Sequence, residues 1–373
     1  MIPGFATAEG TERYRQRFPQ WEKPGHFRRP QNVPGAGELW LPSIGLGTYL
    51  GEPDEATDQR YTEAVAEALR SGINLLDTAI NYRHQRSERN IGHAMAKLMD
   101  AGIRRDEVVV CTKAGYLSFD GDMPADPRAY FMKEYVEPGT LKPQEVAGGM
   151  HCMAPRYLAD QIERSRRNLG LETIDLFYVH NPESQLGEVP REEFRKRLKS
   201  AFEMLEEAVK DGAIRFYGTA TWNAYRVLIS EHEGMELEEV VELARQAGGD
   251  EHHFRFVQAP FNLSMPELFA LRNQHVGKEP GTLLETAAKL GVAVVGSASL
   301  HQGHLTRDLP PFLGERLGLT GDSANAIQFA RSAPGIACAL IGMSRVEHVR
   351  NNLEVAAHPL TPPQTWESLF APR

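Results

Sequence analysis

The chain has little cysteine and no excess of basic charge. Its three cysteines, Cys111, Cys152 and Cys338, are odd in number and far apart, which argues against a disulfide framework and favours a reducing compartment. The formal net charge is -9 and both signs are interspersed, so no basic surface for nucleic acid or anionic lipid is expected. We therefore expect no nucleic-acid partner.

Targeting segments, long hydrophobic runs and a Rossmann glycine motif are missing as well. The first ten residues combine no basic region with an apolar run, and no apolar stretch elsewhere is long enough to cross a bilayer. We therefore expect a cytoplasmic protein with no membrane partner. Because the pattern G-x-G-x-x-G is absent, a dinucleotide must be held by another kind of turn.

What the chain does have is a repeated alternation of strand and helix patterns. A first strand is expected within residues 39–49, and short apolar runs follow near 73–76, 108–112, 174–180, 214–219, 256–258, 292–295 and 336–341. They alternate with helical segments at 57–71, 87–99, 156–169, 192–210, 222–247, 281–290, 321–332 and 346–356. The pattern predicts a single α/β domain, a (β/α)8 TIM barrel, rather than two open sheets. Ser87 is the expected N-cap of the second helix, and Gly234 the expected bend in the fifth.

Three segments fall outside this alternation. Residues 1–37 show no sustained period and are expected to be an extension laid over the barrel or partly disordered, and residues 359–373 a tail extending beyond it. Residues 38–358 are the predicted barrel, including a loop insertion at 114–155 that follows the third strand and is expected to roof the pocket. His151 and Cys152 are adjacent but lack further spaced ligands, so we predict no metal site.

Polar residues that could take part in catalysis lie at the ends of three consecutive predicted strands. Asp77 ends the second strand, and Tyr82 lies in the connection that follows it. Lys113 comes directly after five residues of buried strand, so it needs an anionic partner, for which Asp77 is the candidate. His180 ends the fourth strand. Because strand ends share one mouth in a barrel, all four can meet there.

Residues 72–88, G-I-N-L-L-D-T-A-I-N-Y-R-H-Q-R-S-E, resemble the sequence that identifies the aldo-keto reductase family. Residues 174–180, I-D-L-F-Y-V-H, are similar to the family's fourth strand. The resemblance implies a catalytic tetrad of Asp77, Tyr82, Lys113 and His180 that reduces a small-molecule aldehyde or ketone. Tyr82 is then the proton donor, which Lys113 tunes, while His180 donates a hydrogen bond to the substrate oxygen. Tyr49, Tyr82 and His180 are the expected substrate-binding residues.

The end of the eighth strand is a candidate phosphate site. Ile341-Gly342-Met343-Ser344-Arg345 brings together a small-residue turn, a helix N-terminus and a cationic side chain, a combination that suits phosphate. It resembles the family's segment for the 2′-phosphate of NADPH, which implies NADP(H) as cofactor. The expected cofactor-binding residues are Gly47, Thr48, Asp77, Gln258, Ser344, Arg345, His348, Asn351 and Asn352.

Two strand ends depart from the family pattern. Ala220 and Thr221 stand where the family has the Ser and Asn that hold the nicotinamide, and Ser297 stands where it often has an aromatic residue. These departures favour an alternative, a barrel that binds nucleotide as a regulatory or partner-binding subunit, while the complete tetrad opposes it. Altered carbonyl chemistry, such as isomerisation or elimination with retained cofactor, is a third possibility.

Overall fold

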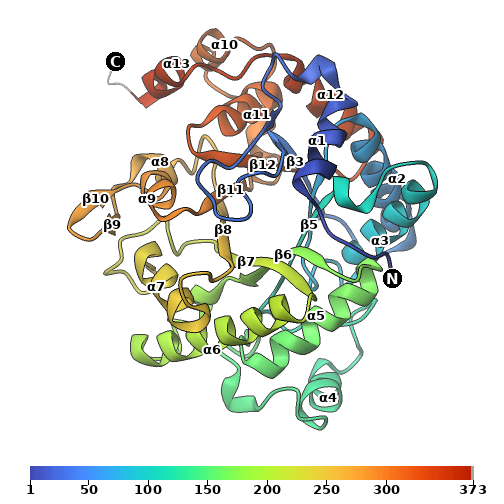
Figure 1. The fold of residues 1–373 in the computed structure, drawn as a ribbon, viewed down its shortest axis with the longest axis vertical. Coiled ribbons are helices and arrows are strands. Elements are labelled where there is room, and N and C mark those ends of the chain that lie inside the picture. Colours follow the sequence, from blue (N-terminus) through green and yellow to red (C-terminus); the bar gives the residue numbers. More distant parts are fainter. Residues whose placement is uncertain (371–373) are drawn as a thin grey trace.

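The computed structural model describes residues 1–370, in which eight parallel strands close into one barrel. Around the barrel the strands follow the order β11-β12-β3-β4-β5-β6-β7-β8, so each neighbours the next barrel strand along the chain. Helices surround the strands on all sides (Figure 1). The predicted (β/α)8 barrel is confirmed.

The barrel strands and their principal helices agree with the sequence pattern to within a few residues at most boundaries. The strands are β3 (Ile44–Gly47), β4 (Leu75–Asp77), β5 (Val109–Ala114), β6 (Ile174–His180), β7 (Ile214–Ala220), β8 (Phe254–Pro260), β11 (Ala293–Ser297) and β12 (Ile336–Gly342). The helices that follow them are α2 (Glu55–Ser71), α3 (Arg86–Asp100), α5 (Pro155–Leu169), α6 (Arg191–Lys210), α7 (Leu237–Gly248), α9 (Leu283–Leu290), α11 (Asp322–Ser332) and α12 (Val346–Glu354).

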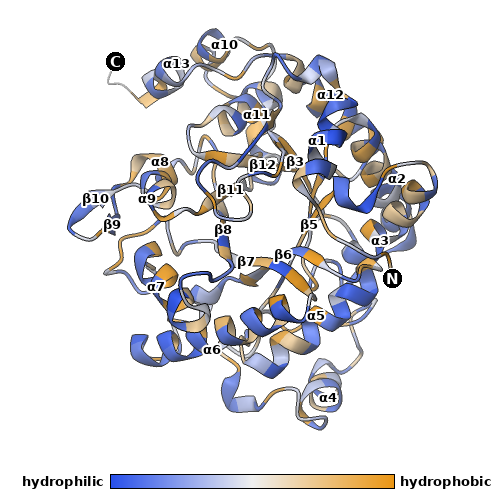
Figure 2. Ribbon diagram, viewed as in Figure 1, coloured by the Kyte–Doolittle hydropathy of each residue, from blue (hydrophilic) through white to orange (hydrophobic). Residues whose placement is uncertain are grey.

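The two sides of each strand face different hydrophobic clusters. In β6, Leu176 and Tyr178 pack inside the barrel, whereas Phe177 and Val179 pack between the strands and the helices. This division follows from the alternation of side chains along a strand, and it explains why the strands read as continuous apolar runs. The helices show hydrophilic stretches along their outer faces and the strands are largely hydrophobic (Figure 2).

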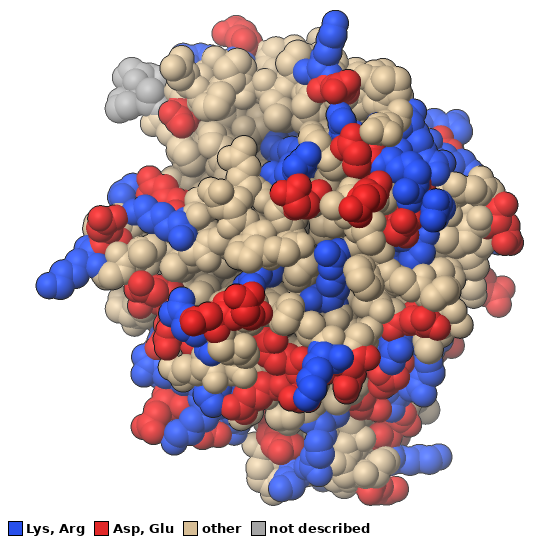
Figure 3. All heavy atoms as spheres, in the orientation of Figure 1, with Lys and Arg blue, Asp and Glu red and all other residues tan. Residues whose placement is uncertain are grey.

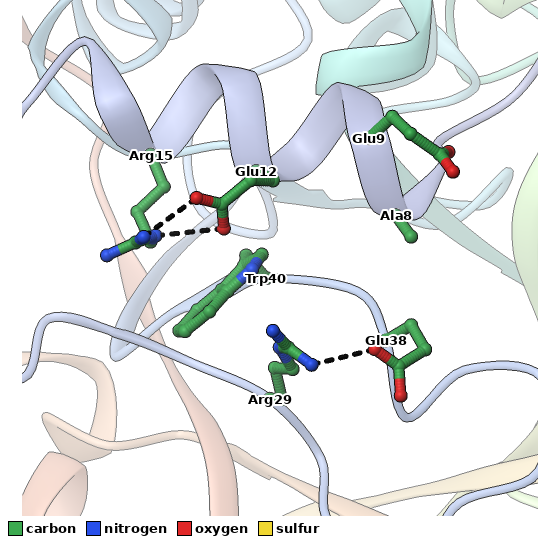
Figure 4. Close-up of a pocket in the computed structure, with 7 residues that line it drawn as sticks. All are labelled: Ala8, Glu9, Glu12, Arg15, Arg29, Glu38 and Trp40. Atoms are coloured by element: carbon green, nitrogen blue, oxygen red, sulfur yellow. Dashed lines mark hydrogen bonds and ion pairs between the residues drawn. The ribbon is translucent and has the colours of Figure 1, made fainter.

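Residues 1–37 contain regular structure that the sequence pattern did not predict. Helix α1 (Ala8–Gln16) begins after Thr7, whose side chain accepts a hydrogen bond from the Gly10 N–H, and β1 (Phe27–Arg28) pairs with β2 (Leu41–Pro42). This N-terminal segment covers the end of the barrel at which the strands begin. Trp40 lies there between the guanidinium groups of Arg15 and Arg29, 4.4 and 4.6 Å from its ring centre (Figure 4). The sequence pattern did not indicate these helices and strands because elements this short leave no sustained period.

The connection after β7 also differs from the expectation. Residues 221–236 form turns rather than the first half of a helix, and α7 begins only at Leu237. Gly234 is therefore a turn residue and not a helix bend, and a Cβ atom there would lie 2.2 Å from the Leu228 carbonyl oxygen. Two further small elements, α8 (Glu267–Ala270) and the hairpin β9 (Gln274–Val276) with β10 (Glu279–Gly281), lie between β8 and α9.

The C-terminal segment packs against the barrel instead of extending away from it. After α10 (Phe312–Leu317) and α12 comes α13 (Pro363–Glu367), whose Trp366 is fully buried. The indole stacks on Phe329 at 5.0 Å and donates its N–H to the Phe329 carbonyl. One aromatic side chain in a proline-rich stretch carries no period, so this anchor could not be predicted from the hydrophobic pattern.

The insertion 114–155 consists of a helical middle and two ends. Its helical middle, α4 (Pro127–Phe131) followed by a π-helical turn (Met132–Val136), packs against α5 through Tyr135 on Tyr157 and Glu134 on Arg164. Only its two ends lie beside β6 at the mouth. The middle therefore does not roof the pocket as expected.

The surface carries charges of both signs, as the composition led us to expect. Acidic and basic side chains alternate over the face seen in Figure 3. Among residues 1–370, no helix has the length and apolar character needed to cross a membrane.

Candidate active site

Strand β4 places Asp77 at the rim where the barrel strands end, which we call the C-terminal rim. Asp77 is 4% exposed and accepts hydrogen bonds from Lys113 Nζ at 2.5 Å and from Gln258 Nε2 at 2.7 Å. Lys113 is completely buried at the end of β5, so Asp77 is the anionic partner that the sequence required. Burial opposes the charge on Lys113, but the carboxylate outweighs this and raises the pKa of the ammonium. The lysine therefore stays cationic.

Tyr82 lies over this ion pair. Its ring centre is 5.1 Å from Lys113 Nζ, and its ring meets those of His180 and Tyr49 edge-on at 5.9 and 5.0 Å. Burial raises the pKa of Tyr82, and the charge of Lys113 offsets part of that rise. The phenol thus carries its proton at neutral pH, beside a cation that stabilises the phenolate once the proton has left.

His180 stands on the other side of Tyr82 as a neutral imidazole. Burial, together with Lys113 and His151, lowers the pKa of His180 well below its usual value. Its Nδ1 atom is buried and has no hydrogen-bond partner within residues 1–370. An orphaned acceptor costs less than an orphaned donor when the ring is neutral, so the proton belongs on Nε2. His180 can accordingly donate a hydrogen bond from Nε2.

The connection behind Tyr82 is held in an unusual conformation. Arg83, His84 and Gln85 have φ angles of 48, 55 and 71°, three consecutive left-handed residues, none of them glycine. The guanidinium of Arg83 fixes this turn by donating to the Asp58 carboxylate at 2.6 Å and to Asn90 Oδ1 at 2.8 Å. Gln85 is therefore the residue before α3, and Ser87 is not its N-cap: the Ser87 hydroxyl donates to the Thr48 carbonyl instead.

The residues predicted for the cofactor occupy two neighbouring parts of the same rim. Gly47 lies in register with Asp77 on one side and Gly342 on the other, and Thr48 donates to the Asp77 carbonyl. Ser344 and Arg345 follow β12, with Arg345 directly before α12. Arg345, His348 and Asn351 are exposed, while Ser344 and Asn352 are half-buried.

Arg345 and Gln258 each keep an unused binding group. Within residues 1–370 the Arg345 guanidinium forms no ion pair, so its charge is available to a ligand. The Gln258 side chain donates from Nε2 to Asp77, which leaves its side-chain Oε1 as an acceptor at the rim.

Two features of the rim carry no signal in the sequence. The loop after β11 contains left-handed residues at Ala298, His301 and Gln302, with φ angles of 53, 45 and 53°.

Glu183 follows β6 and is 3% exposed. Its carboxylate accepts hydrogen bonds from the backbone N–H groups of Trp222 and Asn223 at 2.6 and 3.2 Å. Burial raises the pKa of Glu183 to about 7. Glu183 thus ties the end of β6 to the divergent connection after β7.

His151 lies at the rim, beside the end of β6. Within the described residues no cluster of three or more His, Cys, Asp or Glu side chains is placed to hold a metal ion. The His151 imidazole lies instead against the end of β6, where it hydrogen-bonds the His180 carbonyl.

Comparisons with known proteins identify relatives of this chain. The Aldo/keto reductase family matches residues 43–367. L-glyceraldehyde 3-phosphate reductase of Escherichia coli (strain K12) is 26% identical over 276 residues, which are 73% of this chain. The matched part spans 62% of that relative's length.

Several solved structures share the fold. An aldo-keto reductase from Bacillus halodurans in its holo form has a TM-score of 0.61 and 19% identity, covering 92% of this chain and 95% of its own. The glycerol dehydrogenase of Gluconobacter oxydans has a TM-score of 0.60 and 19% identity, with 92% and 93% covered. An aldo/keto reductase from Klebsiella pneumoniae in complex with NADP and acetate has a TM-score of 0.59 and 17% identity, with 90% and 94% covered.

Proposed function

The chain belongs to the aldo/keto reductase family, and we propose that it reduces an aldehyde or ketone to an alcohol with NADPH. The observation that carries this proposal is the meeting of Asp77, Tyr82, Lys113 and His180 at one rim of the barrel. The catalytic unit in this proposal is the barrel of residues 38–358 with the insertion 114–155 included. Residues 1–37 and 359–373 flank it.

Each of the four side chains has a part in the reaction. NADPH, when bound, supplies the hydride that reaches the carbonyl carbon. Tyr82 donates its phenolic proton to the carbonyl oxygen, where negative charge develops. The Lys113 ammonium has three N–H groups, two of which are taken by Asp77 Oδ1 and the Thr78 carbonyl; the third and the positive charge are left to stabilise the phenolate. His180 donates from Nε2 to the same substrate oxygen.

The residues at the rim suit the groups of an NADP molecule. The unpaired guanidinium of Arg345, with Ser344 and Asn352 beside it, offers charge and donors to a phosphate. Gln258 offers its carbonyl oxygen to the carboxamide N–H₂ of a nicotinamide. Gly47, Thr48, Asp77, His348 and Asn351 complete the proposed cofactor site. Tyr49, which is 55% exposed next to Tyr82, is the proposed outer wall of the substrate site.

The regulatory alternative is favoured by Ala220, Thr221 and Ser297, which offer no amide or ring to a nicotinamide. A two-stage experiment separates it from the reductase. Fluorescence titration with NADPH and NADH measures binding, and a panel of aldehydes and ketones then measures NADPH oxidation. Binding with turnover supports the reductase, whereas NADPH binding without turnover on any carbonyl supports the regulatory alternative. Failure to bind either nucleotide contradicts both.

A further inference from the structure

The returning end of the insertion passes directly behind the end of β6. His151 forms bridges with Tyr116 and with Ala147, and its side chain is almost completely buried. Its Nε2 lies 2.7 Å from the carbonyl oxygen of His180. Strand β6 ends here because Asn181 adopts a left-handed conformation, with φ 44° and ψ 57°. The His180 carbonyl therefore takes its hydrogen bond from the insertion, through His151.

A chain of hydrogen bonds fixes which nitrogen of His151 carries the proton. Arg197 donates to Gln185 Oε1 at 2.7 Å, so the Gln185 amide must present its N–H₂ to His151 Nδ1 at 3.0 Å. Nδ1 is then an acceptor, and Nε2 holds the proton that it donates to the His180 carbonyl. Burial lowers the pKa of His151 to about 4, so this neutral tautomer persists at neutral pH.

The residues around the contact between His151 and His180 are closely packed. A Cβ atom on Gly115 would lie 2.4 Å from the His180 carbonyl oxygen and 2.8 Å from His151 Nε2. The Tyr116 ring meets the imidazoles of His151 and His180 at 5.3 and 5.2 Å, nearly perpendicular to both. The Tyr116 hydroxyl in turn accepts from Asn181 Nδ2 at 3.0 Å. Residues from the insertion therefore clamp both the backbone and the ring of His180.

The His180 ring needs such a clamp because its own hydrogen bonds do not orient it. Nδ1 has no partner within residues 1–370, and Nε2 is the atom that serves the substrate. In many histidine sites a hydrogen bond to the second ring nitrogen sets the orientation. Here orientation depends on the position of the backbone and on the aromatic rings to either side.

We propose that His151 is a positioning residue for carbonyl reduction, which makes the insertion part of the catalytic site. By donating to the His180 carbonyl, His151 fixes the end of β6 and hence the place at which the His180 imidazole meets the substrate oxygen. The inference rests on the proposed function, since it assigns His151 to the reaction that Tyr82 and His180 carry out.

The test compares three substitutions of one residue. Glutamine places an amide nitrogen near the position of Nε2, so His151→Gln keeps a donor to the His180 carbonyl, whereas His151→Asn and His151→Ala do not. We expect kcat to fall about 10- to 100-fold in the Asn and Ala variants. We expect His151→Gln to recover most of that loss, and NADPH affinity to stay within about twofold of wild type in all three, as the proposed cofactor residues lie elsewhere.

His93→Asn on the exposed face of α3 is the matched control and should leave kcat and KM unchanged. Circular dichroism establishes that each variant is folded at the assay temperature. If His151→Asn does not fold, Gln185→Met removes the donor to Nδ1 and should lower kcat in the same direction. Wild-type kcat in His151→Asn, or equal losses in the Gln and Asn variants, would overturn the positioning role. Absence of turnover in the wild-type protein would overturn the proposed function instead.

Discussion

Each end of the barrel contains a buried carboxylate paired with a buried cation. At the C-terminal rim Asp77 pairs with Lys113 at 2.5 Å, and at the opposite end Asp175 pairs with Arg105 at 2.7 Å. All four side chains are at most 5% exposed. The two pairs therefore start from the same chemistry in similar surroundings.

The pairs differ in what their remaining polar atoms contact. Asp175 also accepts the backbone N–H groups of Ala6 and Val110, which fasten the N-terminal segment and β5 to β6. Lys113 spends two N–H groups on Asp77 and the Thr78 carbonyl, and its ammonium lies 5.1 Å from the ring centre of Tyr82. The neighbouring His180 has a buried Nδ1 with no partner among residues 1–370. Both oxygens of Asp175 bind other parts of the fold, and the one Arg105 nitrogen without a partner in residues 1–370, Nε, is buried. The Asp77–Lys113 pair differs because its spare donor lies beside a tyrosine, where it is available for chemistry.

The largest expected effect tests the reactive end. Tyr82→Phe removes the proposed proton donor but keeps the ring that packs on Tyr49 and His180. We expect kcat for carbonyl reduction to fall about a thousandfold. NADPH affinity, measured by fluorescence, should hardly change. Turnover at the wild-type rate in this variant would remove Tyr82 from the mechanism.

The same substitution at the two carboxylates separates stability from activity. Asp175→Asn leaves Arg105 buried without its counter-charge, and we expect a loss of about 3 kcal/mol in the free energy of unfolding, with kcat unchanged in the folded protein. Asp77→Asn also destabilises but should remove most activity, because Lys113 then loses the charge that keeps it protonated. Urea unfolding and steady-state kinetics on both variants are the measurements. Equal activity in the two would mean that the ends do not differ as described.

Glu183 gives the rim a contribution to stability that depends on pH. Its pKa is about 7 in the folded protein against a usual 4.5, so folding binds its proton more tightly. The protonated Glu183 carboxyl therefore contributes fully to the free energy of unfolding below pH 4.5, its usual pKa. This contribution is lost as the pH rises through about 7, the pKa of Glu183 in the folded protein. We expect the wild-type free energy of unfolding to fall relative to Glu183→Gln between about pH 5 and about pH 8, by at most about 3 kcal/mol. Parallel curves for the two proteins would contradict this expectation.

The smallest expected effect concerns the cofactor. Arg345→Ala removes the exposed cation before α12, and we expect NADPH to bind about tenfold more weakly, or about 1.4 kcal/mol, with NADH affinity nearly unchanged. Titration with both nucleotides measures the difference. Arg350→Ala, one turn further on and paired with Glu67, is the matched control. A 2′-phosphate preference that survives Arg345→Ala would refute the assignment.

Most of the barrel was predictable from sequence because each strand is an apolar run and each principal helix repeats its apolar face. Three of the proposed catalytic residues, Asp77, Lys113 and His180, lie at the ends of such runs, and the resemblance to the family's sequence pattern added Tyr82 and the roles of all four. The two ends of the barrel differ here too. The rim is made of strand ends, whereas the N-terminal segment is held by single contacts such as that of Asp175 with the Ala6 N–H, which leave no period.

What sequence missed depends on contacts between distant residues. The partnership of His151 with the His180 carbonyl joins an aperiodic loop to a strand end, and Trp366 stacks on Phe329 from a proline-rich stretch. The turn after Tyr82 was also unforeseen, because Arg83, His84 and Gln85 are residues that rarely adopt positive φ. Its conformation is fixed by the ion pair with Asp58 and not by local preference.

The path of the first residues has a practical consequence for handling the molecule. The Ile2 N–H donates to the Gly170 carbonyl and the Ile2 carbonyl accepts from Glu172, just before β6 begins, while the neighbouring Met1 is 65% exposed. A linker joined at Met1 would thus leave the molecule on the side away from the mouth. If the protein were tethered to a bead or sensor chip through that linker, the C-terminal rim would face the solution, where the proposed cofactor and substrate could reach it.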